Sequence, residues 1–239
     1  EDDVFEIGED AGRTELGDVL ENDDDPDGDP LAIISESVAG APLDIGTATD
    51  LPGGGRLTLF AGGDLVFDPA GDFEKLRANP EPEQPLGRVV VDYVVSDGET
   101  ERAAKAEIGV RGANDAPEPR DDDGPGFEGS EDAAFETASV LENDSDPDEG
   151  DGLRLASFDD AQTDGAVAHL GDGVFAYDPA GAFEFLPEGQ TAFDAFTYAV
   201  ADEAGVERAA EVRIRIEGRN DAPVAVDDDG ALDAAFAVA

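Results

Sequence analysis

The chain has 239 residues, and its 61 acidic residues against 14 lysines and arginines give a formal net charge of −47. This charge excludes nucleic acid and anionic membrane surfaces as natural partners, because their phosphates would be repelled, and it leaves cations as the plausible partners. The absence of cysteine excludes disulfides and thiol-based zinc sites, and no apolar run is long enough for insertion into a membrane.

The sequence is a tandem repeat. The stretch “VLENDDDPDGDPL” (19–31) returns as “VLENDSDPDEGDGL” (140–153), and later motifs recur 106 positions apart, as Asn114 and Asn220 do. We therefore predict two repeats, at 1–117 and 118–223, and the start of a third at 224–239. Because the chain begins with Glu1 and ends on an incomplete copy, we expect it to be a slice of a longer array.

Each repeat is predicted to be all-β. In chain order, strands are expected at 31–38, 55–60, 89–97, 102–112, 153–158, 173–177, 196–202 and 207–218. The last strand shows a period of two, because Val212, Ile214 and Ile216 alternate with charged residues and mark one buried face. The motif “DPAG” (68–71 and 178–181) is typical of a tight turn, and we assign no site to it. About seven short strands in about 110 residues favour a β-sandwich for each repeat.

Two acidic loops, “ENDDDPDGDP” (21–30) and “ENDSDPDEGDG” (142–152), occupy matching places in the two repeats. Carboxylates packed this densely repel one another, and a bound dication would reverse the sign of that energy. Calcium takes six to eight oxygen ligands, whereas magnesium keeps its waters and needs a stricter octahedron. An EF-hand is excluded, because its twelfth position would be Ile34 where a glutamate is required.

Taken in order, “NDDDPDGDPL”, “YVVSDG” and “AEIGVRGANDAP” resemble the bacterial cadherin-like repeats of large secreted, calcium-dependent adhesins and biofilm proteins. They also resemble, in outline, the extracellular cadherin domain. The resemblance covers both repeats and the partial third copy. It implies an all-β chain of two tandem Ig-like, cadherin-like Greek-key β-sandwiches, plus the first strand of a third repeat.

The resemblance also implies a set of calcium ligands at the junctions between repeats. Cadherins use an early acidic residue, a DxD segment, an aspartate in a later loop and an Asn-Asp linker. Carried over in that order, these positions are Glu9 and Glu131; Asp23, Asp25, Asp27, Asp29, Asp144, Asp146, Asp148 and Asp151; Asp97 and Asp202; and Asn114, Asp115, Asn220 and Asp221. We find no match to the mid-domain acidic motif that cadherins also use.

The resulting hypothesis is a non-catalytic, calcium-rigidified spacer or adhesion repeat of a large extracellular surface protein. Its partners would be calcium ions, neighbouring repeats, and a cell-surface glycan, protein receptor or homophilic contact. Two alternatives stay open. One is a glycan-binding β-sandwich, for which the sequence offers few aromatic residues, at 7% with no tryptophan. The other is a halophilic surface or fibre subunit that assembles by strand pairing, without specific metal sites. A hydrolase is disfavoured, because a duplicated loop is a poor place for the separated pKa values that a carboxylate pair needs.

Overall fold

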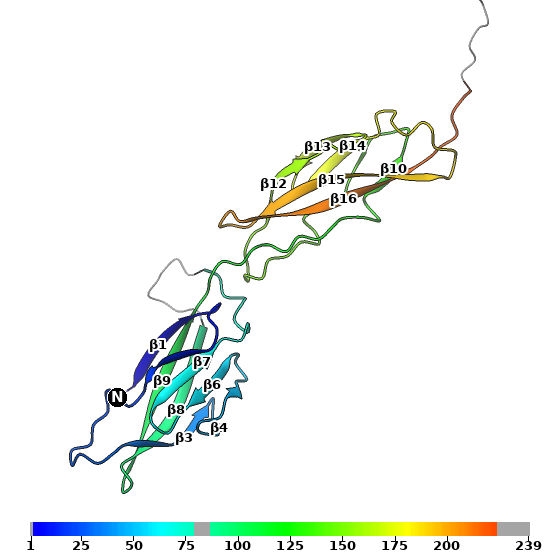
Figure 1. Cartoon of the computed structure of the whole chain (residues 1–239). Coiled ribbons are helices and arrows are strands. Elements are labelled where there is room, and N and C mark those ends of the chain that lie inside the picture. Colours follow the sequence, from blue (N-terminus) through cyan, green and yellow to red (C-terminus); the bar gives the residue numbers. More distant parts are fainter. Residues whose placement is uncertain (1, 79–86, 224–239) are drawn as a thin grey trace, which may run out of the picture. The chain divides into compact units, whose positions relative to one another are not determined.

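The computed structural model describes residues 2–78 and 87–223, and within these ranges every regular element is a β-strand (Figure 1). The chain divides into two compact units. The first contains Glu1–Pro119 with the loops Asp144–Arg154 and Val200–Arg208, and the second contains Arg120–Asn143, Leu155–Ala199 and the chain from Ala209 onward. The segment 224–239, predicted to begin a third repeat, lies outside the described residues. Within the described ranges, no helix is long and apolar enough to cross a membrane.

The first unit contains two sheets that share one hydrophobic core (Figure 1). In spatial order, the larger sheet consists of β1 (Asp3–Gly8), β9 (Glu101–Arg111), β8 (Gly87–Ser96), β3 (Ala32–Val38) and β4 (Ala41–Leu43). The other consists of β2 (Thr14–Asp18), β7 (Asp64–Asp68), β6 (Arg56–Leu59) and β5 (Thr49–Asp50). Val91, Tyr93 and Ile108 from the first sheet and Leu57 and Phe67 from the second are all buried in this core. The first repeat is therefore a two-layer β-sandwich.

The second repeat has the same kind of architecture. One sheet has the order β10 (Glu128–Ser130), β16 (Glu207–Glu217), β15 (Thr191–Ala201) and β12 (Arg154–Asp159). The other has the order β11 (Phe135–Glu136), β14 (Val174–Asp178) and β13 (Ala166–Gly171). The rings of Phe175 on β14 and Phe196 on β15 lie 4.9 Å apart edge to face, which shows that the inner faces of the two sheets meet.

The predicted strands are confirmed, although 196–202 belongs to the longer strand β15. Val212, Ile214 and Ile216 are completely buried, as their alternation indicated. The sequence patterns missed the first strand of each repeat. Both are short and pair parallel to the last strand, β1 with β9 and β10 with β16. Because of this parallel pairing, the residue that follows the first strand of a repeat lies beside the end of its last strand.

A buried glutamate lies in the first sandwich. A bulge in β3 between Ile33 and Ser35 turns Glu36 to the same face as its partner Tyr93 on β8. Glu36 is 4% exposed, and its Oε2 atom has no hydrogen-bond partner among the described residues. Burial, and then the charge of Asp44, raise the pKa of Glu36 to about 7. The ionised side chain therefore lowers the stability of the sandwich.

We expect Glu36→Gln to stabilise the protein above neutral pH. A carboxyl whose pKa is raised from about 4.5 to about 7 on folding makes the free energy of unfolding fall as the pH rises through that window. The variant lacks this loss, so urea unfolding should show it more stable than the wild type by about 1–3 kcal/mol at pH 8 and nearly equal at pH 5. The exposed Glu15 on β2 supplies the control, Glu15→Gln. An equal gain at both pH values for Glu36→Gln would contradict the assignment.

Candidate metal centre

Glu9 is the first member of the candidate site and follows β1 directly. Its backbone NH donates to the carbonyl of Arg111 at 2.9 Å, so the parallel pairing fixes its position at the end of β9. Its side chain is 2% exposed, and Oε1 accepts a hydrogen bond from the backbone NH of Ala113. Oε2 is buried and has no hydrogen-bond partner among the described residues. Burial, and then the nearby charges of Asp115 and Glu74, raise the pKa of Glu9 to about 7.

The second repeat places Glu131 in the same way. The backbone NH of Glu131 donates to the carbonyl of Glu217 at 3.1 Å, and its Oε1 accepts from the backbone NH of Arg219 at 2.6 Å. Glu131 is also 2% exposed, and its Oε2 again has no hydrogen-bond partner within the described residues. One carboxylate oxygen is thus satisfied and the other left open at equivalent places in both repeats. Each repeat thus has one buried acceptor oxygen without a partner at the end of its last strand.

The acidic loop 144–154 meets Glu9 within the first unit. The Oδ2 atom of Asp148 accepts from the backbone NH of Asp115 at 2.9 Å, and the Oδ1 atom of Asp146 accepts from the backbone NH of Asp148 at 3.0 Å. Asp148 is 2% exposed. Ligand oxygens of Glu9, Asp115 and Asp148 lie within 4.8 Å of one another, and so do those of Asp146, Asp148 and Asp151. Asp148 therefore joins two potential ligand groups.

Asn114 and Asp202 support these groups from the linker and from the later loop. The side-chain amide of Asn114 donates to Oδ2 of Asp202 at 2.9 Å and to the carbonyl of Asp115 at 2.7 Å. Asp202 is fully buried. Burial alone would raise its pKa, but hydrogen bonds from Asn114 and from the backbone NH of Val206 outweigh it, and the pKa is lowered. Asp202 thus remains a carboxylate beside the cluster.

The sequence analysis missed one component of the site, an acidic residue in the middle of each repeat. Glu74 groups with Asp10 and Asp115, and Glu184 groups with Asp132 and Asp221, each set with ligand oxygens within 4.8 Å of one another. Both glutamates follow the “DPAG” turn, in “DPAGDFE” and “DPAGAFE”. Their recurrence after the turn was the available signal. It was overlooked because the turn chemistry explained the motif without any ligand.

The corresponding loop of the first repeat is arranged differently. Among the described residues, no group of three potential ligands includes Asp23, Asp25, Asp27, Asp29, Asp97 or Asp144. Oδ1 of Asp25 accepts from the backbone NH groups of Asp27 and Asp29, at 2.8 and 3.1 Å. Asp97 accepts from the backbone NH groups of Thr100 and Glu99, and these bonds lower its pKa to about 2. Asp23, Asp25 and Asp97 do line one hollow, but they are not joined there by a linker residue.

At the opposite end of the second repeat, Asn220 donates to the carbonyl of Asp221 at 3.3 Å.

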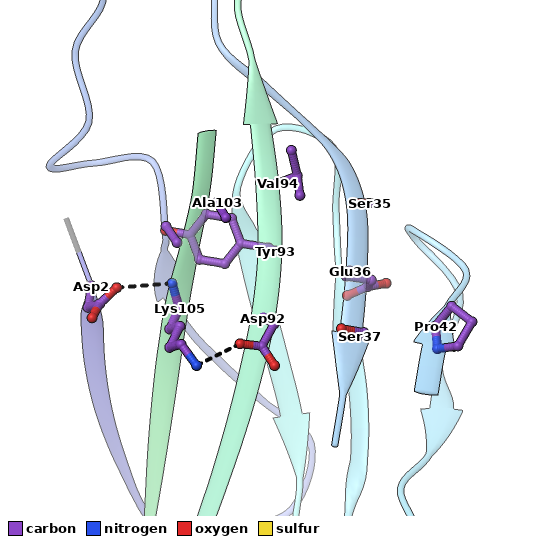
Figure 2. Close-up of a pocket in the computed structure, with 11 residues that line it drawn as sticks. Asp2, Ser35, Glu36, Ser37, Pro42, Asp92, Tyr93, Val94, Ala103 and Lys105 are labelled. Atoms are coloured by element: carbon purple, nitrogen blue, oxygen red, sulfur yellow. Dashed lines mark hydrogen bonds and ion pairs between the residues drawn. The ribbon is translucent and has the colours of Figure 1, made fainter. Parts of the chain in front are cut away.

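A separate hollow lies on the outer face of the larger sheet of the first repeat (Figure 2). Lys105 is its centre: Nζ pairs with Asp92 at 2.9 Å, and its backbone NH donates to Asp2 at 3.2 Å. Tyr93 contributes to the lining, but it is 1% exposed and its hydroxyl donates to Asp3. The hollow therefore presents no aromatic ring on which a sugar could stack.

The comparisons with known proteins agree with this architecture. Residues 114–218 match the bacterial cadherin-like domain family, and residues 1–108 match the bacterial Ig domain family. Each match covers a little under half of the chain, and each repeat is therefore similar to domains of one of these two families. Domains of this kind are typically extracellular and generally non-enzymatic. No curated protein matches the chain.

Two solved structures of human protocadherin-24 repeats EC1-2 share the fold. The form II crystal structure has a TM-score of 0.52 at 17% identity, covering 91% of this chain and 94% of that chain. The other has a TM-score of 0.50 at 18% identity, covering 92% and 94%. Identities this low show the fold alone, which is an all-β, sandwich-like fold of the cadherin and Ig type.

We expect Gly112→Ala to disturb the site through the backbone. A Cβ atom at Gly112 would overlap the carbonyl oxygens of Leu76 and Arg77, in the loop that carries Glu74. Relief of the overlap must shift the 74–77 loop and the linker relative to each other, at a cost in stability of about 1–3 kcal/mol. Calorimetric titration should show weaker calcium binding, and urea unfolding should show the lower stability.

Gly8→Ala is the matched control, because Gly8 adjoins Glu9 and a Cβ there would contact nothing within 4 Å. If both variants bind calcium equally well, the 74–77 loop does not contribute to the site.

Proposed function

We propose that this chain is a calcium-binding, non-catalytic pair of repeats from an extracellular surface protein, in which calcium stiffens the junction between repeats. One observation carries the proposal. Four carboxylate oxygens around the 144–154 loop are buried and have no hydrogen-bond partner among the described residues: Glu9 Oε2, Asp115 Oδ2, Asp146 Oδ2 and Asp148 Oδ1. Unpaired buried charges of one sign are strongly unfavourable unless a cation compensates them.

The donor set fits calcium. All the convergent atoms are carboxylate oxygens, with a partly buried Asn-Asp linker beside them. Hard oxygen ligands in flexible loops suit calcium better than magnesium or zinc. The residues that would hold the ion are Glu9, Asp115, Asp146 and Asp148, with Glu74 and Asp151 at either side. Bound calcium would supply positive charge where these residues now repel one another, and it has no chemical step to perform.

The location of the cluster supports a structural role. Loops 144–154 and 200–208 come from the second repeat in sequence, yet they group with the first compact unit. An ion held by Glu9 and Asp115 on one side and by Asp146 and Asp148 on the other would tie these segments together. Extracellular modules bind calcium with dissociation constants of about 10⁻⁴–10⁻³ M. At 10 mM calcium, a site of about 10⁻⁴ M would add about 2.7 kcal/mol of stability.

The glycan-binding alternative has less support. The hollow around Lys105 is lined by small and charged side chains, and its tyrosine is buried (Figure 2). This hollow therefore does not support a glycan as the partner of the full protein. The spacer or adhesion role rests on the family of the domains and on the junction cluster.

Asp146→Ala and Asp25→Ala form a matched pair that tests the proposal. Both aspartates lie at the same position of the repeated loop, and each accepts a hydrogen bond from the backbone NH two residues later. We expect 10 mM calcium to raise the melting midpoint of the chelator-treated wild type by about 10–20 °C. Asp25→Ala should keep this rise, and Asp146→Ala should lose more than half of it.

The competing hypothesis of a halophilic surface gives a different result. If sodium chloride at equal ionic strength raises the midpoint as much as calcium does, and titration calorimetry detects no saturable binding, the clusters are not metal sites. The proposal then fails.

A further inference from the structure

We propose that Arg77 is a built-in counter-cation of the junction, which competes with metal for Asp151 and Glu203. The expected effect of Arg77 on calcium affinity rests on the proposed calcium function, whereas its expected effect on the metal-free loops can be measured without any metal. Nη2 of Arg77 lies 2.6 Å from Oε2 of Glu203 and 3.5 Å from Oδ1 of Asp151. No feature of the repeat pattern demands an arginine here, because the second repeat has Pro187 at the equivalent place in “FEFLP”.

The position of the guanidinium determines what it can do. Asp151 belongs to the ligand group with Asp146 and Asp148, and its side chain is only 4% exposed. Arg77 is 42% exposed and approaches this group from the loop that follows Glu74. One small hollow beside the cluster is lined by Arg77, Ala78, Asn114, Asp148, Asp151, Glu203 and Ala204. The guanidinium therefore occupies the outer side of the acidic group, where an additional cation would otherwise be attracted.

A second arginine lies at these loops and has a different role. Arg154 donates to the backbone carbonyl of Asp202, so it braces the loop main chain. Arg77, in contrast, contacts carboxylates directly, and it links the segment after Glu74 to the two loops 144–154 and 200–208. In the absence of metal, Arg77 thus places a positive charge beside Asp151.

Two consequences follow from this geometry. Without metal, Arg77 reduces the repulsion among the acidic side chains and links both loops to the segment that follows Glu74. With metal, its charge opposes the approach of a dication, since like charges a few ångströms apart in a partly solvated site lower affinity by about tenfold or more. Arg77 would therefore make the arrangement of the junction loops less dependent on calcium, and it would lower their affinity for calcium.

The experiment compares Arg77→Gln with Lys75→Gln. Lys75 lies two residues away in the same loop, is exposed, and forms no ion pair with the residues that the structure describes. The two variants therefore change the net charge equally, but only one removes the contact to Asp151 and Glu203.

The first measurement is amide hydrogen exchange in chelator. Segments 144–154 and 200–208 should exchange at least severalfold faster in Arg77→Gln than in Lys75→Gln or the wild type. The second measurement is calorimetric titration with calcium at fixed ionic strength, where Arg77→Gln should bind about tenfold more tightly than Lys75→Gln. Equal exchange rates in the two variants, or calcium affinities within twofold of each other, would overturn the role of Arg77.

The design separates the two proposals. If none of the three proteins binds calcium, the proposed calcium function fails, and the exchange rates in chelator still decide whether Arg77 is the counter-cation. If calcium binds to all three but Arg77→Gln matches Lys75→Gln, the calcium function stands and the inference about Arg77 is wrong.

Discussion

The desolvation of carboxylates is the constraint on which the rest of this structure depends. A chain with a net charge of −47 can keep most of its acidic side chains in water, where repulsion is screened. At the junction loops it does not: Glu9, Asp148 and Asp202 are at most 2% exposed. Hydrogen bonds from Ala113, Asp115 and Asn114 satisfy one oxygen of each. The oxygens left over at Glu9 and Asp148 are buried without a hydrogen-bond partner among the described residues, and they are the charges that the proposed cation would compensate.

The strand topology explains why the carboxylates gather where they do. Because β1 runs parallel to β9, the chain leaves both strands at the same end of the sandwich, and Glu9 comes to lie beside the linker that begins at Gly112. Gly112 then lets the loop after the “DPAG” turn pass close to the linker backbone, which brings Glu74 to Asp10 and Asp115. Gly218 has the same relation to Leu186 and Pro187 in the second repeat. The metal candidates are thus consequences of strand pairing and of one close backbone approach, repeated in each copy.

This origin also determines how much the sequence could predict. The long strands were predictable because alternation at residues such as Val212, Ile214 and Ile216 reports a buried face directly. Local motifs likewise indicated Asp146, Asp148 and Asp115. Glu74 and Arg77 were not predictable in this way, because their roles depend on the approach of a loop to residues more than 35 positions away. The two acidic loops could not be distinguished for the same reason. Asp25 and Asp146 share a local pattern, yet among the described residues only the loop of Asp146 contains a residue, Asp148, whose oxygens group with carboxylates from other segments.

The difference between the two copies is therefore more informative than their similarity. The repeated features, namely the half-satisfied Glu9 and Glu131 and the triads containing Glu74 and Glu184, describe what every junction of this kind would require. At one equivalent position the two repeats differ, because the first has Arg77 where the second has Pro187. A cation supplied by the chain is always present and carries one charge, whereas calcium carries two and depends on its concentration. Under the proposed calcium function, a junction with Arg77 would thus bind calcium at a higher concentration than one with proline at this position.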